Sequence, residues 1–166
     1  MPALAEIIDA LQQKFAGLAR SEFRGQQRVV VSASASHDLF AELKNKYGFD
    51  LLVDVTCVDY LNYRGATDRF GLVYSLSNTT TNDRLIVRAF VNEPDPTIAT
   101  VTDLWAGANW MEREVYDMFG IVFAGHPDLR RILMPEEVTA FPLRKDYPMQ
   151  GRGERHNFPV LRRADA

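Results

Sequence analysis

Residues 51–91 read LLVDVTCVDYLNYRGATDRFGLVYSLSNTTTNDRLIVRAFV, and this stretch decides the fold. Within it, residues 51–60, 70–76 and 85–91 each alternate apolar with other side chains. Alternation with a period of two residues is typical of strands that bury one face. The polar loops between these segments are too short for the helical crossovers that parallel neighbours need. The sequence therefore predicts an antiparallel meander of three strands.

Helical patterns flank this meander on both sides. Upstream, apolar residues at helical spacing predict amphipathic helices over 4–18 and 37–47, with a short β-branched strand over 28–32 between them. Downstream, a capping residue followed by proline favours a helix over 96–105, and a second short helix is expected over 109–119. The predicted class is α+β, an antiparallel sheet with helices mainly on one face.

The character of the chain changes from about residue 127. Five of the eight prolines lie within 127–166, spaced so that no long helix or central strand fits between them. We therefore expect an α+β domain over 1–126 and an extended, Pro/Arg-rich C-terminal arm over 127–166. Simple disorder is the alternative. Apolar side chains at intervals favour an arm that docks on another protein surface: Phe141, Leu143, Tyr147, Met149, Phe158, Val160 and Leu161.

Charge is unevenly distributed along the chain. Residues 144–163 hold six basic and two acidic side chains, a local charge of +4, so the rest carries −7 of the formal net charge of −3. A basic tail can bind nucleic acid or an anionic membrane. Here the arginines are spread among prolines and aromatic residues beside an acidic body, which disfavours nucleic acid as a partner. The charge pattern points to protein partners.

Several classes of protein are excluded by motif and composition. The single cysteine, Cys57, cannot form an internal disulfide, an all-cysteine zinc site or an iron–sulfur cluster, and its place in an alternating strand predicts a buried core thiol. No dinucleotide, P-loop or nucleophile-elbow motif is present. No apolar run approaches the roughly 20 residues that cross a bilayer, so we expect no direct membrane insertion. Glu6 and Asp9 precede the first basic residue, which is unlike an export signal.

Two clusters of ionisable residues are candidates for chemistry. The first lies on the predicted helix over 109–119: Glu112, Arg113, Glu114 and Asp117. Glu114 and Asp117 are spaced to share a helix face, as in metal or acid–base sites, but Arg113 is spaced to neutralise Asp117 in a surface ion pair. The second cluster, in GHPDLRR at 125–131, suits anion binding or proton transfer, or a turn whose arginines pair with the first cluster: His126, Asp128, Arg130 and Arg131.

The block EREVYDMFGIVFAGHPDLRRIL at 112–133 resembles the signature of the thirty-kilodalton subunit family of respiratory complex I, whose bacterial member is called the C subunit of NADH-quinone oxidoreductase. FPLRKDYP at 141–148 resembles the second block of that family, and LLVDVTCVDY and FGLVYSL fit its weaker N-terminal pattern. One departure falls between 136 and 142, where the family usually shows an acidic–aromatic pair and a glycine. This chain has Glu137, Val138 and Ala140 there.

The resemblance implies a structural and assembly subunit in the peripheral arm of a proton-translocating NADH:quinone oxidoreductase. It implies no catalytic residue, cofactor or metal in this chain, with FMN and iron–sulfur clusters carried by partner subunits. The implied partners are the forty-nine-kilodalton or D subunit and neighbouring cluster-bearing subunits, on the cytoplasmic face of a bacterial membrane. The alternative is the equivalent subunit of a related membrane-bound hydrogenase or of a ferredoxin- or plastid-type complex.

Within that interpretation, the two charged clusters are expected to form one network that fixes the corner between the helix and the arm and binds a partner in part. Three residues of the second block are expected to lie along the partner: Arg144, Lys145 and Asp146. Two other classes compete with this hypothesis. One is a standalone enzyme with its active site at the 112–117 and His126 regions, and the other is a nucleic-acid- or membrane-binding module driven by the tail.

Overall fold

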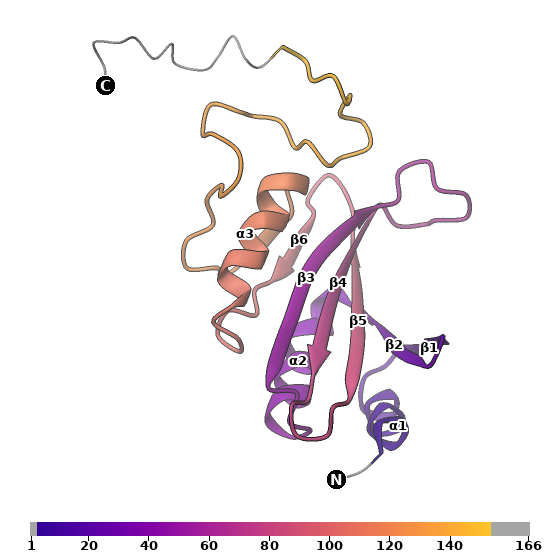
Figure 1. Ribbon diagram of the computed structural model, residues 1–166. Helices are drawn as coiled ribbons and strands as arrows, with labels where there is room; N and C mark the ends of the chain where they lie inside the picture. Colours follow the sequence, from indigo (N-terminus) through magenta and orange to yellow (C-terminus); the bar gives the residue numbers. More distant parts are fainter. Residues whose placement is uncertain (1–2, 154–166) are drawn as a thin grey trace.

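The computed structural model describes residues 3–153 (Figure 1). Three α-helices and seven strands are present in this part of the chain. In chain order the elements are α1 (Leu4–Lys14), β1 (Ala19–Phe23), β2 (Gln26–Ser32), the 3-10 turn η1 (Ala33–Ala35), α2 (Ser36–Asn45), β3 (Leu51–Asp59), β4 (Phe70–Ser77), β5 (Arg84–Val91), β6 (Thr97–Ala99), α3 (Ala108–Phe119) and β7 (Val122–Ala124).

Five of the strands form one sheet, in the order β1-β2-β5-β4-β3. The antiparallel pairs β3–β4 and β4–β5 confirm the predicted meander. The sheet is not wholly antiparallel, however, because β2 runs parallel to β5, from Gln27 beside Leu85 to Ser32 beside Phe90. The chain between these two strands contains α2 and the other two meander strands, which provide the crossover that a parallel pair requires.

One face of the sheet carries the core. Tyr74 on β4 is fully buried, and its ring centroid lies 4.5 Å from that of Phe40 on α2. Phe40 also contacts the ring of Trp105 at 6.1 Å, and Val115 of α3 is buried in the same core. Helices mainly on one face, as predicted, therefore cover this side of the sheet. Cys57 is a buried core thiol, as expected, and burial raises its pKa to about 12.

The opposite face of the sheet, called here the open face, is not covered by a helix of the described chain. On β3 its side chains are exposed, with Leu51 46%, Val53 51% and Val58 39% exposed. An irregularity in the β3–β4 register lies between Leu52 and Asp54. Such a bulge lets Val53 and Asp54 both face away from the core.

One local prediction was wrong, and the strands β1 and β7 were not predicted. The segment expected to be a helix over 96–105 instead holds β6, which pairs in parallel with β7 from Thr97 beside Val122 to Ala99 beside Ala124. Ile98 is buried by this pairing, whose partner strand lies beyond α3 in the sequence. The five residues of β1 are all exposed and so show no apolar alternation.

The chain after β7 forms no helix or strand within 125–153 and passes over the end of α3 (orange to yellow in Figure 1). The backbone N–H of Leu143 donates to the carbonyl of Met118 at 3.1 Å. Part of the predicted arm therefore lies on the domain, and the boundary at 126/127 stays a prediction. Arg155, Arg162 and Arg163 lie outside the described residues. In the described part of the chain, no helix is long and apolar enough to cross a membrane.

Candidate functional site

The C-terminal end of α3 sets the geometry of the candidate site. Gly120 stops the helix in the left-handed conformation, with φ of 74°, and its N–H donates to the carbonyl of Tyr116 at 2.8 Å. A Cβ at Gly120 would lie 2.6 Å from the Phe141 ring and 2.8 Å from Nη2 of Arg144. The glycine therefore gives both side chains of the later segment room to lie directly on the helix end.

Asp117 is the centre of a buried hydrogen-bond cluster. Its Oδ1 accepts from Nη1 of Arg131 at 2.7 Å, and its Oδ2 accepts the backbone N–H groups of three consecutive residues: Ile132 at 3.1 Å, Leu133 at 2.7 Å and Met134 at 2.8 Å. Burial alone would raise the pKa of Asp117, but these amides and Arg131 hold it below its ordinary value. One carboxylate thus holds the backbone of three consecutive residues.

Two arginines complete this cluster. Arg131 also donates to the carbonyl of Ala140 at 3.2 Å, so it joins the two ends of the loop over 131–140. Arg113, one turn before Asp117 on α3, donates to the carbonyls of Arg130 at 3.1 Å and Arg131 at 3.2 Å. We call Arg113, Asp117 and Arg131 the corner cluster. Its side chains hold the segment after β7 against α3 by hydrogen bonds to main-chain N–H and carbonyl groups and by the Asp117–Arg131 ion pair.

Glu112 belongs to a separate contact on the same helix. It is fully buried, its Oε2 accepts from Oγ1 of Thr100 at 2.5 Å, and its Oε1 accepts from the N–H of Val101 at 2.8 Å. Burial raises the pKa of Glu112 to about 7, although these two hydrogen bonds act in the opposite direction. Glu112 therefore holds the chain after β6 against α3.

A second cluster binds the later part of the arm. Arg144 donates through Nε to the carbonyl of Phe119 at 2.5 Å and through Nη1 to Glu93 at 2.9 Å. Asp59, at the end of β3, accepts the backbone N–H of Lys145 at 2.9 Å. Arg69 connects the group, because it pairs with Asp59, Glu93 and, at 3.0 Å, Asp146. We call Asp59, Arg69, Glu93, Arg144 and Asp146 the arm cluster.

Asp59 is almost fully buried in the arm cluster, with 4% of its surface exposed. Burial alone would raise its pKa, but the N–H of Lys145 and the guanidinium of Arg69 hold it below the ordinary value. Sequence reasoning missed Asp59, Arg69 and Glu93. A signal for Asp59 was available, because it continues the buried positions Val55 and Cys57 of β3 and so places a carboxylate on the core face.

The structure divides the predicted network into parts. Asp128 and Arg130 form an exposed ion pair at 2.9 Å, and His126 contacts the carbonyl of Asn109 at 3.2 Å. Glu114 is exposed and does not share the buried face of Asp117. The Lys145 side chain is exposed as well.

The predicted surface ion pair between Arg113 and Asp117 is wrong. Both side chains are buried, and Asp117 pairs with Arg131, which the loop after β7 brings back over α3. Residues 3–153 bring no three His, Cys, Asp or Glu side chains together in a group that could hold a metal ion.

The residues that match known proteins include both the corner cluster and the arm cluster. The family model for the respiratory-chain NADH dehydrogenase 30 kDa subunit matches residues 29–153. Among curated relatives, the C subunit of NADH-quinone oxidoreductase from Geotalea uraniireducens is 47% identical over 143 residues, covering 85% of each chain. The C subunit from Laribacter hongkongensis is 39% identical, over 95% of this chain and 86% of its own.

Two solved structures are similar to this chain. One is a trypsin-resistant fragment (1–134) of Nqo5, with a TM-score of 0.70 and 39% identity, covering 76% of this chain and 98% of the fragment. The other belongs to the membrane-bound sulfane sulfur reductase, an archaeal respiratory membrane complex, with a TM-score of 0.73 and 26% identity over 87% and 85%. From the extent of the family match and of these relatives, this chain belongs to the family of the 30 kDa subunit of respiratory-chain NADH dehydrogenase.

Proposed function

We propose that this chain is a non-redox structural and assembly subunit in the peripheral arm of a proton-translocating NADH:quinone oxidoreductase. The family match over residues 29–153 carries the proposal. Electron transfer from NADH through FMN and iron–sulfur clusters to quinone then belongs to partner subunits. The chain acts on the cytoplasmic face of the membrane without inserting into it, and it has no active site of its own.

The chemistry of Cys57 supports a role without redox chemistry. It is the single cysteine of the chain, whereas an iron–sulfur cluster takes about four thiolate ligands. Thiolate, not thiol, is the reactive form, and burial raises the pKa of Cys57 to about 12. Cys57 therefore stays protonated in the core at neutral pH.

The two clusters support a role in assembly. The corner cluster and the arm cluster hold residues 130–147 in one course over α3 and the end of β3. A segment held in place before binding loses less conformational entropy when a partner docks on it. We propose that the forty-nine-kilodalton or D subunit and its cluster-bearing neighbours bind along this segment, with exposed Asp128, Arg130 and Lys145 available to them.

Purification of the native complex tests this function. A tagged chain expressed in its own host is expected to bring down flavin- and cluster-bearing subunits at one copy each, with NADH-dependent quinone reduction, while the isolated chain is colourless. Recovery of the tagged chain as a monomer with its own turnover would refute the proposal.

A second candidate is the equivalent subunit of another membrane-bound respiratory complex. The similarity to a chain of the sulfane sulfur reductase complex favours it, although at 26% identity, against 47% for the relative from Geotalea uraniireducens. The purified complex separates the two candidates. Electron donation by NADH supports the first, and a complex that is reduced by another donor but not by NADH supports the second.

A further inference from the structure

Ion pairing divides the arginines of this chain by location. Arg20, Arg69, Arg130, Arg131 and Arg144 each pair with a carboxylate, and Arg113 and Arg152 donate to backbone carbonyls. Five others make no ion pair within residues 3–153, and all five lie on strands β2 and β5 or on the turns at the ends of the sheet: Arg24, Arg28, Arg64, Arg84 and Arg88. A chain whose charge outside 144–163 is −7 thus leaves a group of cations uncompensated.

Arg28 and Arg88 lie next to each other on the open face. The parallel register places Arg28 of β2 beside Ile86 of β5 and places Val30 of β2 beside Arg88. The positions between them, such as Val87, are buried in the core, so the two arginines share the opposite face. Their side chains are therefore diagonal neighbours on the surface that no described helix covers.

Arg88 lies at the edge of an aromatic hollow. Its guanidinium carbon is 5.0 Å from the Phe90 ring centroid and 5.7 Å from that of Tyr60, and its Nη2 donates to the Tyr60 hydroxyl at 2.5 Å. Gly71 makes room for this arrangement, since a Cβ there would lie 2.8 Å from the Tyr60 ring. The hollow, of about 290 Å³, is also lined by Arg64.

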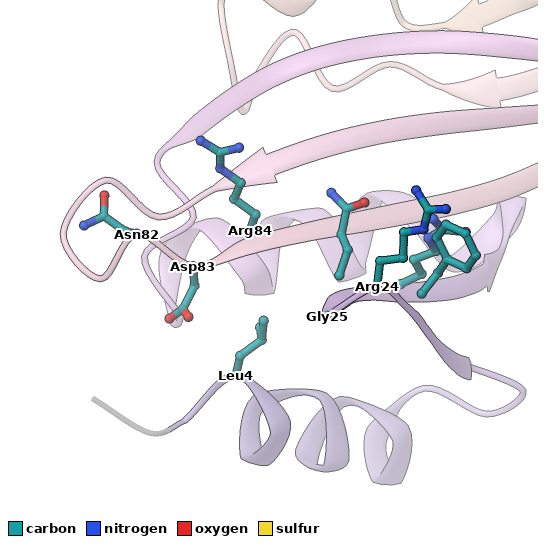
Figure 2. Close-up of a pocket in the computed structure, with 9 residues that line it drawn as sticks. Leu4, Arg24, Gly25, Asn82, Asp83 and Arg84 are labelled. Atoms are coloured by element: carbon teal, nitrogen blue, oxygen red, sulfur yellow. The ribbon is translucent and has the colours of Figure 1, made fainter.

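Both arginines contain a buried donor without a partner. The Nε atoms of Arg28 and Arg88 are two of the four buried side-chain polar atoms in the described chain that make no hydrogen bond. Arg28 stacks on Phe23 at 4.9 Å and lines a second hollow, of about 610 Å³. Figure 2 shows this hollow between α1, the β1–β2 turn with Arg24, and the start of β5 with Arg84.

The carboxylates that line these hollows, Asp83 and Asp68, and the exposed Asp54 of β3 do not pair with the arginines. Asp83 accepts a hydrogen bond from Thr81, and Asp68 accepts one from Asn92. Asp54 is exposed on β3, opposite Ser75. None of the three forms an ion pair within residues 3–153. A carboxylate partner for the guanidinium group of Arg28 or Arg88 therefore has to come from outside the described chain.

The side chains of the open face indicate which kind of molecule supplies acceptors for its arginines. A carboxylate is the natural partner of a guanidinium, because its two oxygens accept two parallel N–H bonds. Leu51 and Val53, about half exposed, lie on the same face and give apolar area that phosphate backbones and lipid headgroups do not use. Arginine and aromatic side chains around small hollows are typical anchor positions of protein–protein interfaces.

The geometry points to the open face of the sheet as a docking surface for an acidic polypeptide segment of a neighbouring subunit, whose carboxylates are seated on Arg28 and Arg88. This inference rests on the proposed function, because the partner is a subunit of the same complex. The surface borders α1 at the hollow beside Arg28 and otherwise lies on the side of the sheet away from α2 and α3, so it is distinct from the corner cluster and the arm cluster.

Charge reversal in the native complex tests the inference. The tagged double variant Arg28→Glu, Arg88→Glu is compared with the wild type and with Lys46→Glu, which makes the same charge reversal once, at an exposed residue just after α2. We expect the double variant to bring down about tenfold less of the other subunits, or less still, and Lys46→Glu to match the wild type. Recovery of the double variant at the wild-type level overturns the inference. If even the wild type recovers no other subunit, the proposed function fails as well.

Two further measurements identify the occupant and control for folding. A photo-crosslinking side chain at Val58, exposed on the open face, is expected to attach to an Asp- or Glu-containing peptide of another subunit in the purified complex. Attachment to lipid, to nucleic acid or to a second copy of this chain overturns the inference. If the double variant does not fold, Arg88→Gln replaces it. We then expect normal thermal unfolding of the free chain with weaker, less salt-sensitive assembly, and unchanged assembly would contradict us.

Discussion

The backbone N–H of Lys145 donates to Oδ2 of Asp59 at 2.9 Å, across 86 positions of sequence. The bond joins the last residue of β3 to the middle of the second family-like block. Arg69 strengthens it by pairing with both Asp59 and the neighbouring Asp146. The first half of the arm is thus held by the domain, and the two are expected to respond together to mutation.

Gly120→Ala is expected to detach the arm from α3. The new Cβ would collide with Phe141 and Arg144, and φ of 74° disfavours any side chain there. We expect a loss of about 2 to 4 kcal/mol in the free energy of unfolding and faster trypsin cleavage between 120 and 150. Gly17→Ala is the control, because φ is +80° there and nothing lies within 4 Å of the added Cβ. Equal losses in the two variants would show that the packing of the arm contributes nothing.

Asp117→Asn is expected to weaken the corner cluster. An amide places an NH₂ group either toward Arg131 or toward the three backbone N–H groups, so one side loses its acceptor. The expected cost is about 3 kcal/mol in denaturant unfolding at pH 7. Glu114→Gln, exposed on the same helix, should change stability by less than about 0.5 kcal/mol. A cost for Asp117→Asn no larger than that of this control would contradict the assignment.

The lowered pKa of Asp117 also predicts how the stability of the protein changes at acid pH. Its pKa is lowered in the folded state, so its stabilisation is complete above the unfolded value of 3.8 and is lost as the pH falls through the folded-state pKa. Asp59 acts in the same direction. We therefore expect the wild type to lose stability below about pH 4. The double variant Asp59→Asn, Asp117→Asn should show a flatter curve there, and an unchanged slope would be evidence against both assignments.

Glu112 predicts the opposite dependence at higher pH. Its folded-state pKa is raised from 4.5 to about 7, so the folded state holds a proton that the unfolded chain releases. The contribution of Glu112 to stability is then greatest below pH 4.5 and falls as the pH rises through about 7, by an amount on the order of 3 kcal/mol. Glu112→Gln should remove this fall in thermal unfolding scans from pH 5 to 8. A variant that keeps the wild-type slope would assign the dependence to another group.

Arg144→Ala is expected to impair assembly and not chemistry. The change removes the bond to the Phe119 carbonyl and leaves Glu93 with Arg69 alone, so the free chain should lose about 2 kcal/mol. Arg130→Ala should leave the free chain within about 0.5 kcal/mol of the wild type, because its pair with Asp128 is exposed. We expect both variants to lower the yield of complex in native gels, with normal turnover per assembled complex. Normal yield with lost turnover would count against the proposed function.

The local pattern of apolar residues predicted the strands that pair with a neighbour close in sequence. The meander over β3–β5 was predictable because each strand pairs with the next and buries one face. The strand β6 was not predictable in this way, because Asp95 and Pro96 favour the start of a helix. The structure of this segment is determined by its pairing with β7, which follows α3 in the sequence. The parallel pairing of β2 with β5 left no local trace either.

The candidate sites show the same division between local and distant contacts. Arg113, Asp117 and Arg131 could be identified from the sequence as charged residues near a turn. That Asp117 pairs with Arg131 and not with Arg113 could not be predicted. Arg69 and Glu93 lie in loops without any motif and are brought to Arg144 by the fold alone. The sequence did not show the uncompensated charge on the open face either, because whether Arg28 and Arg88 find a carboxylate partner within residues 3–153 depends on the folded surface.

The parallel pairing of β2 with β5 has a consequence for synthesis of the chain. The N-terminal part of the chain, through β2 and α2, lacks its central neighbour strand β5 until residue 91 has left the ribosome. Contacts this distant in sequence form late in folding and slow it. The nascent N-terminal hairpin of β1 and β2 must therefore wait with an unpaired edge, a state in which chains aggregate or engage chaperones.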